Sequence, residues 1–149
     1  MSDIDLFKLY SAKILKLAAD IPLLGQLESP DATVKRRSPL CGSTVSVDIS
    51  MVDGCIDQYA HDVKACALGQ AAASVVAANV VGRTGEEIRT ARDQLLAMLA
   101  DHGPEPSPPF DDLKVLLPAR EFVNRHASIM LALQATLEAI EQTQKPNTP

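Results

Sequence analysis

The hydrophobic residues near the start of the chain recur with a helical period. Most lie three to four residues apart, at Leu6, Leu9, Tyr10, Ile14, Leu17 and Ile21. This spacing places them on one face of a helix, so the pattern predicts a helix over residues 3–20. Pro22 and Gly25 follow and are expected to end it. Residues 22–40 contain three prolines among mixed polar residues, which indicates an irregular, exposed connection.

The period then changes from that of a helix to that of a strand. Every second residue is apolar, at Val45, Val47, Ile49 and Met51, which predicts a half-buried strand. Asp53-Gly54 is a strong signal for a two-residue hairpin turn, because both residues tolerate a positive φ. A second strand over residues 55–62 is therefore expected to pair back antiparallel. A weaker pattern over residues 31–37 indicates a third strand.

Two helices are expected after the sheet. The alanine-rich segment over residues 64–81 favours a helix because alanine has the highest helix propensity. Gly82 stands where a helix C-cap glycine is expected. Thr84 and Glu87 have the spacing of a capping box, in which the two side chains bind the first amides of a helix. That helix is expected to run to about Ala100, with a buried face formed by Ile88, Ala91, Leu95 and Leu99.

The last part of the chain begins with a proline-rich loop over residues 101–110, which no helix can cross. Asp111 or Asp112 is expected to cap a short helix over residues 113–117. A final helix is predicted over residues 119–142. Its apolar face is formed by Phe122, Ile129, Met130, Leu133, Leu137 and Ile140.

The order of these elements predicts an α+β fold, in which a small antiparallel three-stranded sheet packs against about four to five helices. A length of 149 residues fits one domain over residues 1–149, with a flexible tail at 143–149. The chain is 46% hydrophobic but only 3% aromatic and has no tryptophan. The core is therefore expected to consist mainly of Ala, Val, Leu and Ile.

Charge and motifs argue against several functions. A net charge of −5 argues against nucleic-acid binding, and the basic run Lys35-Arg36-Arg37 is interpreted as a solvated turn. The chain has no glycine-rich phosphate loop, no Gly-x-Ser-x-Gly and no HExxH motif, so we do not expect an enzyme. No segment has the pattern of a membrane span or a secretory signal. Three cysteines then favour a reducing cytoplasm.

Two cysteines lie next to small residues and are candidates for a metal site. Cys41 is followed by Gly42, which lets the backbone pass close to whatever the sulfur binds. Cys66 lies where a strand gives way to a helix, and the positive end of a helix favours a thiolate over a thiol. Two interpretations stay open: ligands of one metal site, or cysteines that pack as small apolar groups. Cys55 directly follows the hairpin turn and is expected to lie away from both.

Four segments of the chain resemble one protein family. They read "LYSAKILKLAADIPLLGQL", "SPLCGS", "DVKACALGQAAASVVA" and "FVNRHASIMLAL", and they follow the order found in the NifU/IscU/SufU-type iron–sulfur cluster scaffold proteins. The resemblance covers residues 6–140 and implies that family's SufE/NifU-like sandwich. It also implies that Cys41 and Cys66 bind metal and that Arg125, at a usually basic position, contacts a partner.

The chain departs from this family at two positions. Ser43 stands where the family has an aspartate, and Ser128 stands where it has a third cysteine. A serine hydroxyl is a poor ligand for zinc or iron because it must first lose a tightly held proton. Both serines remain candidates for lining the site. His126 and His61 are candidates for additional ligands, because a neutral imidazole binds both metals.

The resemblance implies a non-enzymatic scaffold or carrier that binds iron or an iron–sulfur cluster through Cys41 and Cys66. A [2Fe–2S] cluster is expected, and two copies of the chain would supply the usual four thiolates. The expected partners are a cysteine desulfurase and cluster-recipient proteins, without nucleic acid or membrane. Two alternatives stay open. One is a zinc- or iron-binding acceptor that relays sulfur from the desulfurase, and the other is a metal-free interaction module with the same fold.

Overall fold

The computed structural model describes residues 10–39 and 42–144. Four α-helices, one 3₁₀ helix and three strands lie within these ranges. In chain order they are α2 (Ala12–Ala19), β1 (Ala32–Arg37), β2 (Thr44–Val52), β3 (Cys55–Lys64), α3 (Ala67–Asn79), α4 (Gly85–Ala100), the 3₁₀ helix η1 (Asp111–Glu121) and α5 (Val123–Gln144). No helix within these ranges is long and apolar enough to cross a membrane.

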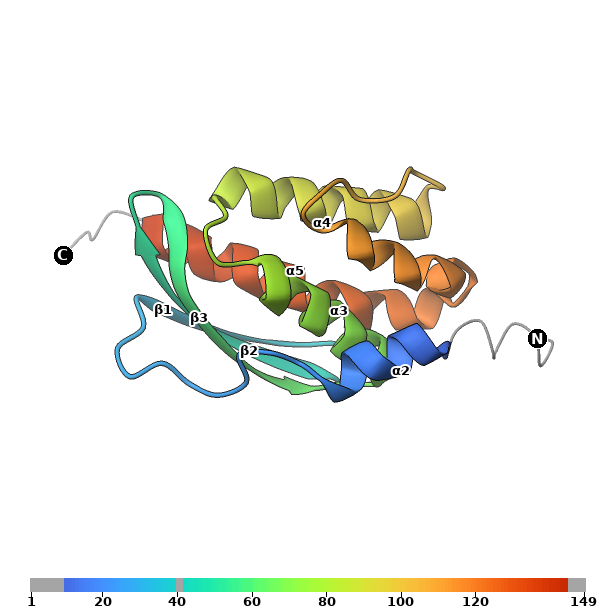
Figure 1. Ribbon diagram of the computed structural model, residues 1–149, viewed down its shortest axis with the longest axis horizontal. Helices are drawn as coiled ribbons and strands as arrows, with labels where there is room; N and C mark the ends of the chain where they lie inside the picture. The colour runs from blue at the N-terminus through green and yellow to red at the C-terminus, as the bar shows by residue number, and fades with distance from the viewer. Residues whose placement is uncertain (1–9, 40–41, 145–149) are drawn as a thin grey trace.

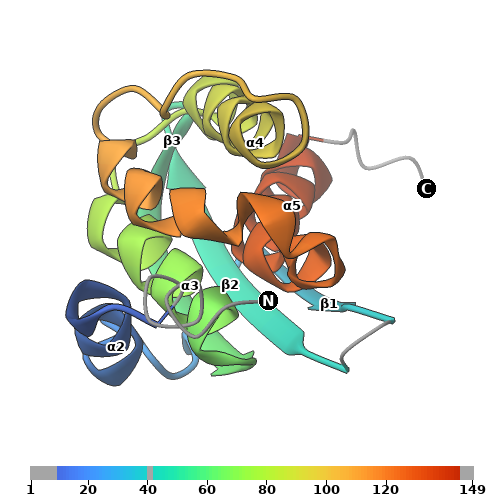
Figure 2. The same ribbon diagram turned by 90° about the vertical axis from the view of Figure 1, so that its right-hand side faces the viewer.

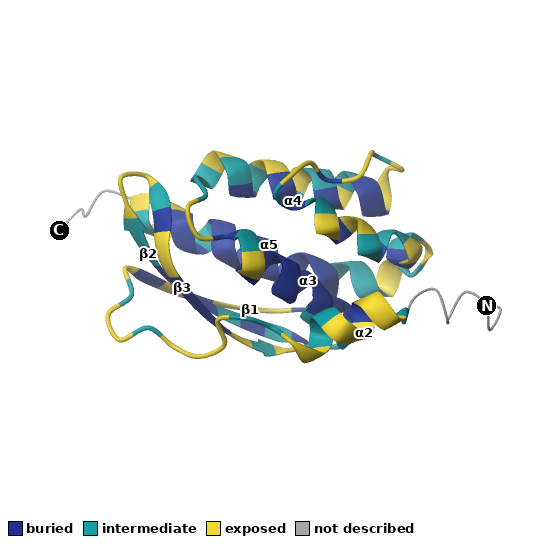
Figure 3. Cartoon of the chain, viewed as in Figure 1, coloured by how far each residue is buried: buried dark blue, intermediate teal, exposed yellow. Residues whose placement is uncertain are grey.

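The elements form layers on a small sheet (Figures 1 and 2). Helix α5 packs against β1 and β2, and α3 packs against β3 and against α5. Helices α4 and η1 form an outer layer on α3 and α5, and α2 packs beside α3. The buried residues gather where α3 and α5 meet the sheet (Figure 3). The predicted α+β fold is therefore confirmed.

The sheet has the strand order β1-β2-β3 and is antiparallel throughout. Val45, Val47 and Ile49 are at most 1% exposed and face the helices, as their alternation predicts. The turn between β2 and β3 is formed by Asp53 and Gly54, with φ angles of 52° and 80°. All three strands are confirmed, including the first, whose sequence pattern was weak.

Several helices begin later than the sequence predicts. Helix α2 starts at Ala12, where the Ser11 hydroxyl accepts a hydrogen bond from the Ile14 amide, and residues 1–9 lie outside the described part. Helix α3 starts at Ala67 because β3 continues to Lys64. Gly82 has a φ of 91° but lies two residues beyond the C-cap Val80, so it belongs to the following turn.

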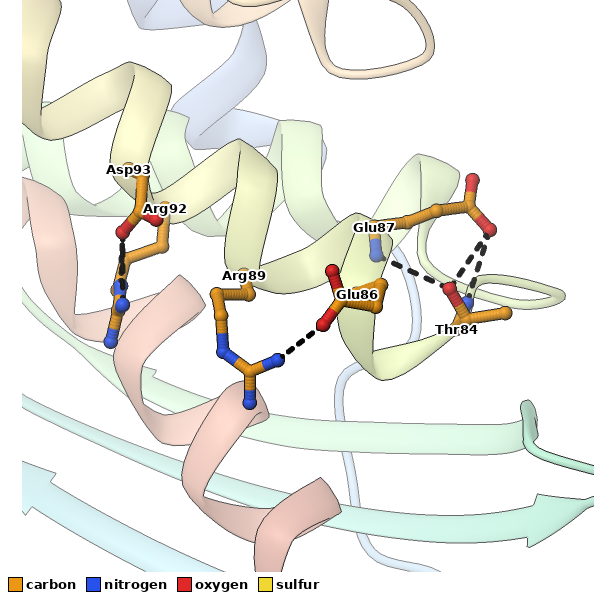
Figure 4. A network of polar contacts seen from close by, with 6 residues as sticks. All are labelled: Thr84, Glu86, Glu87, Arg89, Arg92 and Asp93. Atoms are coloured by element: carbon orange, nitrogen blue, oxygen red, sulfur yellow. Dashed lines mark hydrogen bonds and ion pairs between the residues drawn. The ribbon is translucent and has the colours of Figure 1, made fainter.

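Helix α4 is the element that the sequence predicts best. The Thr84 hydroxyl accepts a hydrogen bond from the Glu87 amide at 3.2 Å, and the Glu87 carboxylate accepts one from the Thr84 amide (Figure 4). The Thr84 bonds lower the pKa of Glu87, and Arg83 adds to this effect. The helix ends at Ala100, and the four predicted inward residues are all buried.

The segment before α5 differs from its prediction. The short helix expected over residues 113–117 is a longer 3₁₀ helix, η1, whose N-cap is Phe110 and which contains Pro118. Proline has no amide hydrogen and its ring crowds the preceding turn, so it does not fit the interior of an α-helix. The chain therefore keeps 3₁₀ geometry to Glu121, and α5 begins at Val123 instead of 119.

His61 joins β3 by hydrogen bonds to the segment that follows α2. Its amide donates to the Leu23 carbonyl at 3.1 Å, its carbonyl accepts from the Gly25 amide at 2.9 Å, and its Nε2 lies 2.8 Å from the Pro22 carbonyl. A carbonyl only accepts, so Nε2 carries the proton and Nδ1 is bare. This Nδ1 is buried without a hydrogen-bond partner among the described residues.

This arrangement makes the free energy of unfolding depend on pH. Burial lowers the pKa of His61 from its ordinary value, against smaller opposite effects of the Pro22 carbonyl and Asp62. The folded state therefore binds this proton less readily than the unfolded state does. The stability that the neutral ring provides is complete above the ordinary histidine pKa and is lost as the pH falls towards the lowered one.

We expect His61→Gln to reduce this acid sensitivity, because a glutamine amide can donate to Pro22 but does not titrate. Urea unfolding near pH 7.5 and near pH 5 measures the effect. The wild type should lose more free energy of unfolding than the variant between the two pH values. Equal losses in the two proteins would show that His61 does not carry the dependence.

Candidate metal centre

Cys66 is the N-cap of α3, so its side chain lies at the start of a helix. Its φ and ψ are −66° and 169°, which is extended backbone, and its carbonyl accepts the hydrogen bond of Gln70 in the first turn. The Cys66 side chain is half-buried and makes no capping bond. The positive end of the helix dipole favours negative charge at this position, as on a metal-bound thiolate.

Ser128 and Ser43 lie beside this cysteine. The Ser128 hydroxyl is 3.6 Å from the Cys66 sulfur and donates a hydrogen bond to the Ser43 hydroxyl at 3.1 Å. Ser128 belongs to α5, and Ser43 directly precedes β2. Both residues are buried, at 1% and 5% exposure. The structure therefore brings three of the predicted site residues to one point, although 85 positions separate the two serines in sequence.

Cys41 lies outside the described residues, so its role as a ligand stays a prediction. The described residues on either side of it belong to the connection between β1 and β2. The Ser38 amide donates to the Ser43 carbonyl at 2.8 Å, and the Gly42 amide donates to the Ser38 carbonyl at 2.9 Å. Gly42 has a φ of 70°, a conformation that glycine adopts without strain.

Gly69 sets how closely α3 approaches α5 at the site. A Cβ atom on this residue would lie 2.6 Å from the Ser128 hydroxyl and 2.9 Å from the Ala65 Cβ. Only glycine leaves room for this contact, which holds Ser128 against Cys66. Gly69 is not part of any of the motifs from which the site was predicted. The available signal is a glycine inside a strong helix former, which costs about 1 kcal/mol relative to alanine and so suggests a packing role.

The structure does not show His126 as part of this group. Its Nε2 lies 3.0 Å from the carbonyls of both Ala119 and Arg120, so this nitrogen carries a proton and donates to the end of η1. Only Nδ1 keeps a lone pair for a metal. Among the described residues no hydrogen bond joins the ring to Cys66, so ligation by His126 stays a prediction.

His61 and Cys55 lie along β3, away from its Cys66 end. The register pairs Lys64 with Thr44 next to the site, whereas His61 pairs with Val47, roughly 10 Å farther along the strand. The His61 ring lies beside Tyr59, with ring centres 5.4 Å apart. Cys55 begins the strand at its opposite end, roughly 30 Å from Lys64, as its place after the hairpin turn predicts.

Arg125 lies in the first turn of α5, near Ser128 in sequence. Its amide donates to the Phe122 carbonyl at 2.8 Å, and its side chain is half-buried. Its guanidinium makes no hydrogen bond or ion pair with the described residues. The predicted contact with a partner is therefore compatible with this position but stays a prediction.

The Cys66–Ser128 and Ser128–Ser43 distances are each close to the distance between two ligands of one metal ion. Tetrahedral zinc binds sulfur at about 2.3 Å and oxygen at about 2.0 Å, so a sulfur and an oxygen on one ion lie about 3.5 Å apart and two oxygens about 3.3 Å apart. The observed distances are 3.6 Å and 3.1 Å. Within residues 10–39 and 42–144 no three His, Cys, Asp or Glu side chains could hold a metal ion.

Comparison with solved structures finds 31 similar chains, among them the following three. A nitrogen-fixing NifU-like protein (N-terminal) from Brucella abortus is 44% identical, covers 94% of this chain and 97% of its own, and has a TM-score of 0.92. A putative iron–sulfur cluster assembly scaffold protein for the SUF system from Fervidobacterium islandicum AW-1 is 17% identical over 90% of this chain and 98% of its own, with a TM-score of 0.80.

The third chain is a hypothetical protein, 25% identical over 91% of this chain and 98% of its own, with a TM-score of 0.78. No model of a known protein family matches the sequence, and no curated protein matches it. The Fervidobacterium protein is 17% identical, so its similarity shows the fold alone. The Brucella protein is identical to this chain at nearly half of the aligned residues.

We expect Gly69→Ala to destabilise the protein by about 1–3 kcal/mol, because the added methyl group overpacks the contact with Ser128 and Ala65. At an exposed helical position the same change would stabilise by up to about 1 kcal/mol. Urea unfolding measures the difference. Ser128→Ala provides the control, since combining it with Gly69→Ala should recover part of the loss. A Gly69→Ala protein as stable as the wild type would contradict the proposed crowding.

Proposed function

Because the chain belongs to the NifU-like family, we propose that it is an assembly scaffold or carrier for iron–sulfur clusters. The main observation behind the proposal is that Ser128 contacts both Cys66 and Ser43, and that the three residues come from separate parts of the fold. These residues match three of the four site positions that the resemblance of the sequence implies. Identity of 44% over 94% of the chain supports the same function.

In this proposal the cluster is cargo and not a permanent part of the protein. The Cys41 and Cys66 thiolates bind iron, and the two serines line the buried side of the site. Cys66 is half-buried, so the residue is partly accessible to a donor or a recipient. The hydroxyls of Ser128 and Ser43 bind iron more weakly than thiolates do, because they must first lose a proton. Such a site assembles a cluster and gives it up again, without an enzymatic step.

The ligand count favours a cluster shared by two copies of the chain. A [2Fe–2S] cluster usually takes four thiolates. The chain has three cysteines, and Cys55 lies at the opposite end of β3 from Cys66. One chain thus supplies Cys41 and Cys66, and two chains supply the full set. The proposed partners are a cysteine desulfurase as sulfur donor, with Arg125 in its contact surface, and apoproteins that receive the cluster.

A second candidate function is sulfur transfer without cluster assembly. The Cys66 sulfur has a single hydrogen-bond partner within the described ranges, the Ser128 hydroxyl, and it is partly accessible. These features also suit a cysteine that accepts a sulfur atom from a desulfurase and hands it on, with zinc or iron bound beside it. The two functions differ in whether a coloured cluster forms.

Anaerobic reconstitution with iron and sulfide tests the first proposal. The wild type should develop visible charge-transfer absorption, contain one cluster for every two chains and have the mass of a dimer. We expect Cys66→Ala and Cys41→Ala to abolish the absorption because each removes a ligand. Cys55→Ala is the matched control and should keep it.

Two results would overturn this proposal. A colourless protein that binds zinc and accepts labelled sulfur on Cys66 would favour sulfur transfer. Equal loss of colour in Cys55→Ala and Cys66→Ala would show that the site is assigned to the wrong residues. A coloured monomer would retain the scaffold function but exclude the shared cluster.

A further inference from the structure

A cleft of about 330 Å³ opens where α2, α3 and η1 meet, away from the strands that frame the metal centre. The three elements contact one another, and Figure 2 shows α2 beside α3. Its volume lies at the lower end of the range for pockets that bind small molecules, roughly 300–1,000 Å³. The described residues that line it are Lys13, Lys16, Leu17, Asp20, Ser74 and Asp112. None of them belongs to the proposed cluster site.

Ser74 gives this cleft a feature that a simple surface hollow lacks. It lies in the middle of α3 and is only 3% exposed, yet its side chain lines the cleft. Buried polar groups are almost always hydrogen-bonded, and a helical serine often binds the carbonyl four residues earlier. The Ser74 hydroxyl makes no hydrogen bond with any described residue. It is therefore available to a polar group of a bound molecule.

The charged residues of the cleft define which molecule would fit. Lys13 and Lys16 are three residues apart on α2 and so lie on one face of it, whereas Asp20 ends that helix and Asp112 comes from η1. None of the four forms an ion pair with another described residue. Among the described residues, two positive and two negative charges line the cleft, so these charges sum to zero.

We propose that the cleft binds a free α-amino acid as its zwitterion. The carboxylate would contact Lys13 and Lys16, the ammonium group would contact Asp20 and Asp112, and Ser74 would donate or accept one further bond. Leu17 offers an apolar surface for a small side chain. The two aspartates disfavour a phosphate or another simple anion, and the two lysines disfavour a simple cation. This function is independent of the cluster site and does not rest on it.

A titration of the isotope-labelled full chain followed by NMR tests the proposal. L-alanine and L-leucine are the probes, and propionate and ethylamine each carry only one of the two charged groups. We expect saturable shifts of α2, α3 and η1 amides with either amino acid at about millimolar concentration. Propionate and ethylamine should bind at least tenfold more weakly. Vesicles of phosphatidylethanolamine, whose headgroup is also zwitterionic, should not bind the protein.

Two variants connect the binding to the named residues. Ser74→Ala removes one neutral hydrogen bond and should weaken binding about threefold to tenfold. Lys16→Met should weaken it by at least as much, because it removes a charged partner. Lys64→Met on β3 is the control of the same chemistry outside the cleft and should bind like the wild type. The spectrum of each variant without ligand shows whether it is folded.

Three results would overturn the proposal. The first is the absence of saturable shifts with both amino acids up to about 10 mM. The second is binding of propionate or ethylamine as tightly as the amino acids, which would mean that one charge suffices. The third is an equal loss of affinity in Lys64→Met and Lys16→Met. Cluster assembly by the Cys66 site should be unchanged in Ser74→Ala, so a failure here leaves the proposed scaffold function intact.

Discussion

The close approach of α3 to α5 at Gly69 is the contact on which the candidate metal centre depends. A Cβ atom at this position would lie 2.6 Å from the Ser128 hydroxyl, so the two helices can approach this closely only with glycine there. Cys66 caps α3 one turn before this contact, and Ser128 lies on α5 within it. The position of both groups is therefore fixed by helix packing, and β2 adds Ser43 from the adjoining sheet.

The fold follows from the sequence wherever local chemistry decides it. The alternation from Val45 to Met51, the Asp53-Gly54 turn and the Thr84–Glu87 capping box each specify an element through neighbouring residues, and the structure contains all three. Helix boundaries were predicted less well because distant residues set them. The start of α3 depends on how far β3 can pair with β2, and Pro118 holds η1 in 3₁₀ geometry through residues expected in α5.

The candidate site was predictable in part. The small residues beside Cys66 and its place at the start of a helix identified one of its members, and the resemblance to a family added Ser128 and Ser43. Periodicity cannot show that residues 62 positions apart lie 3.6 Å from each other, since tertiary packing alone produces such a contact. The same limit applies to His61 and His126, whose Nε2 atoms are bound to backbone carbonyls that no sequence motif reveals.

The two serines also explain how the candidate site can be folded without a metal ion. Two buried thiolates or a buried carboxylate would need a cation or proton to offset their desolvation, whereas neutral hydroxyls need only a hydrogen bond. The Ser128 hydroxyl donates a hydrogen bond to the Ser43 hydroxyl at 3.1 Å and also lies 3.6 Å from the Cys66 sulfur. Folding is thus independent of metal at these positions. Binding iron through a serine oxygen must break that hydrogen bond, which opposes long retention of the cargo and favours its release.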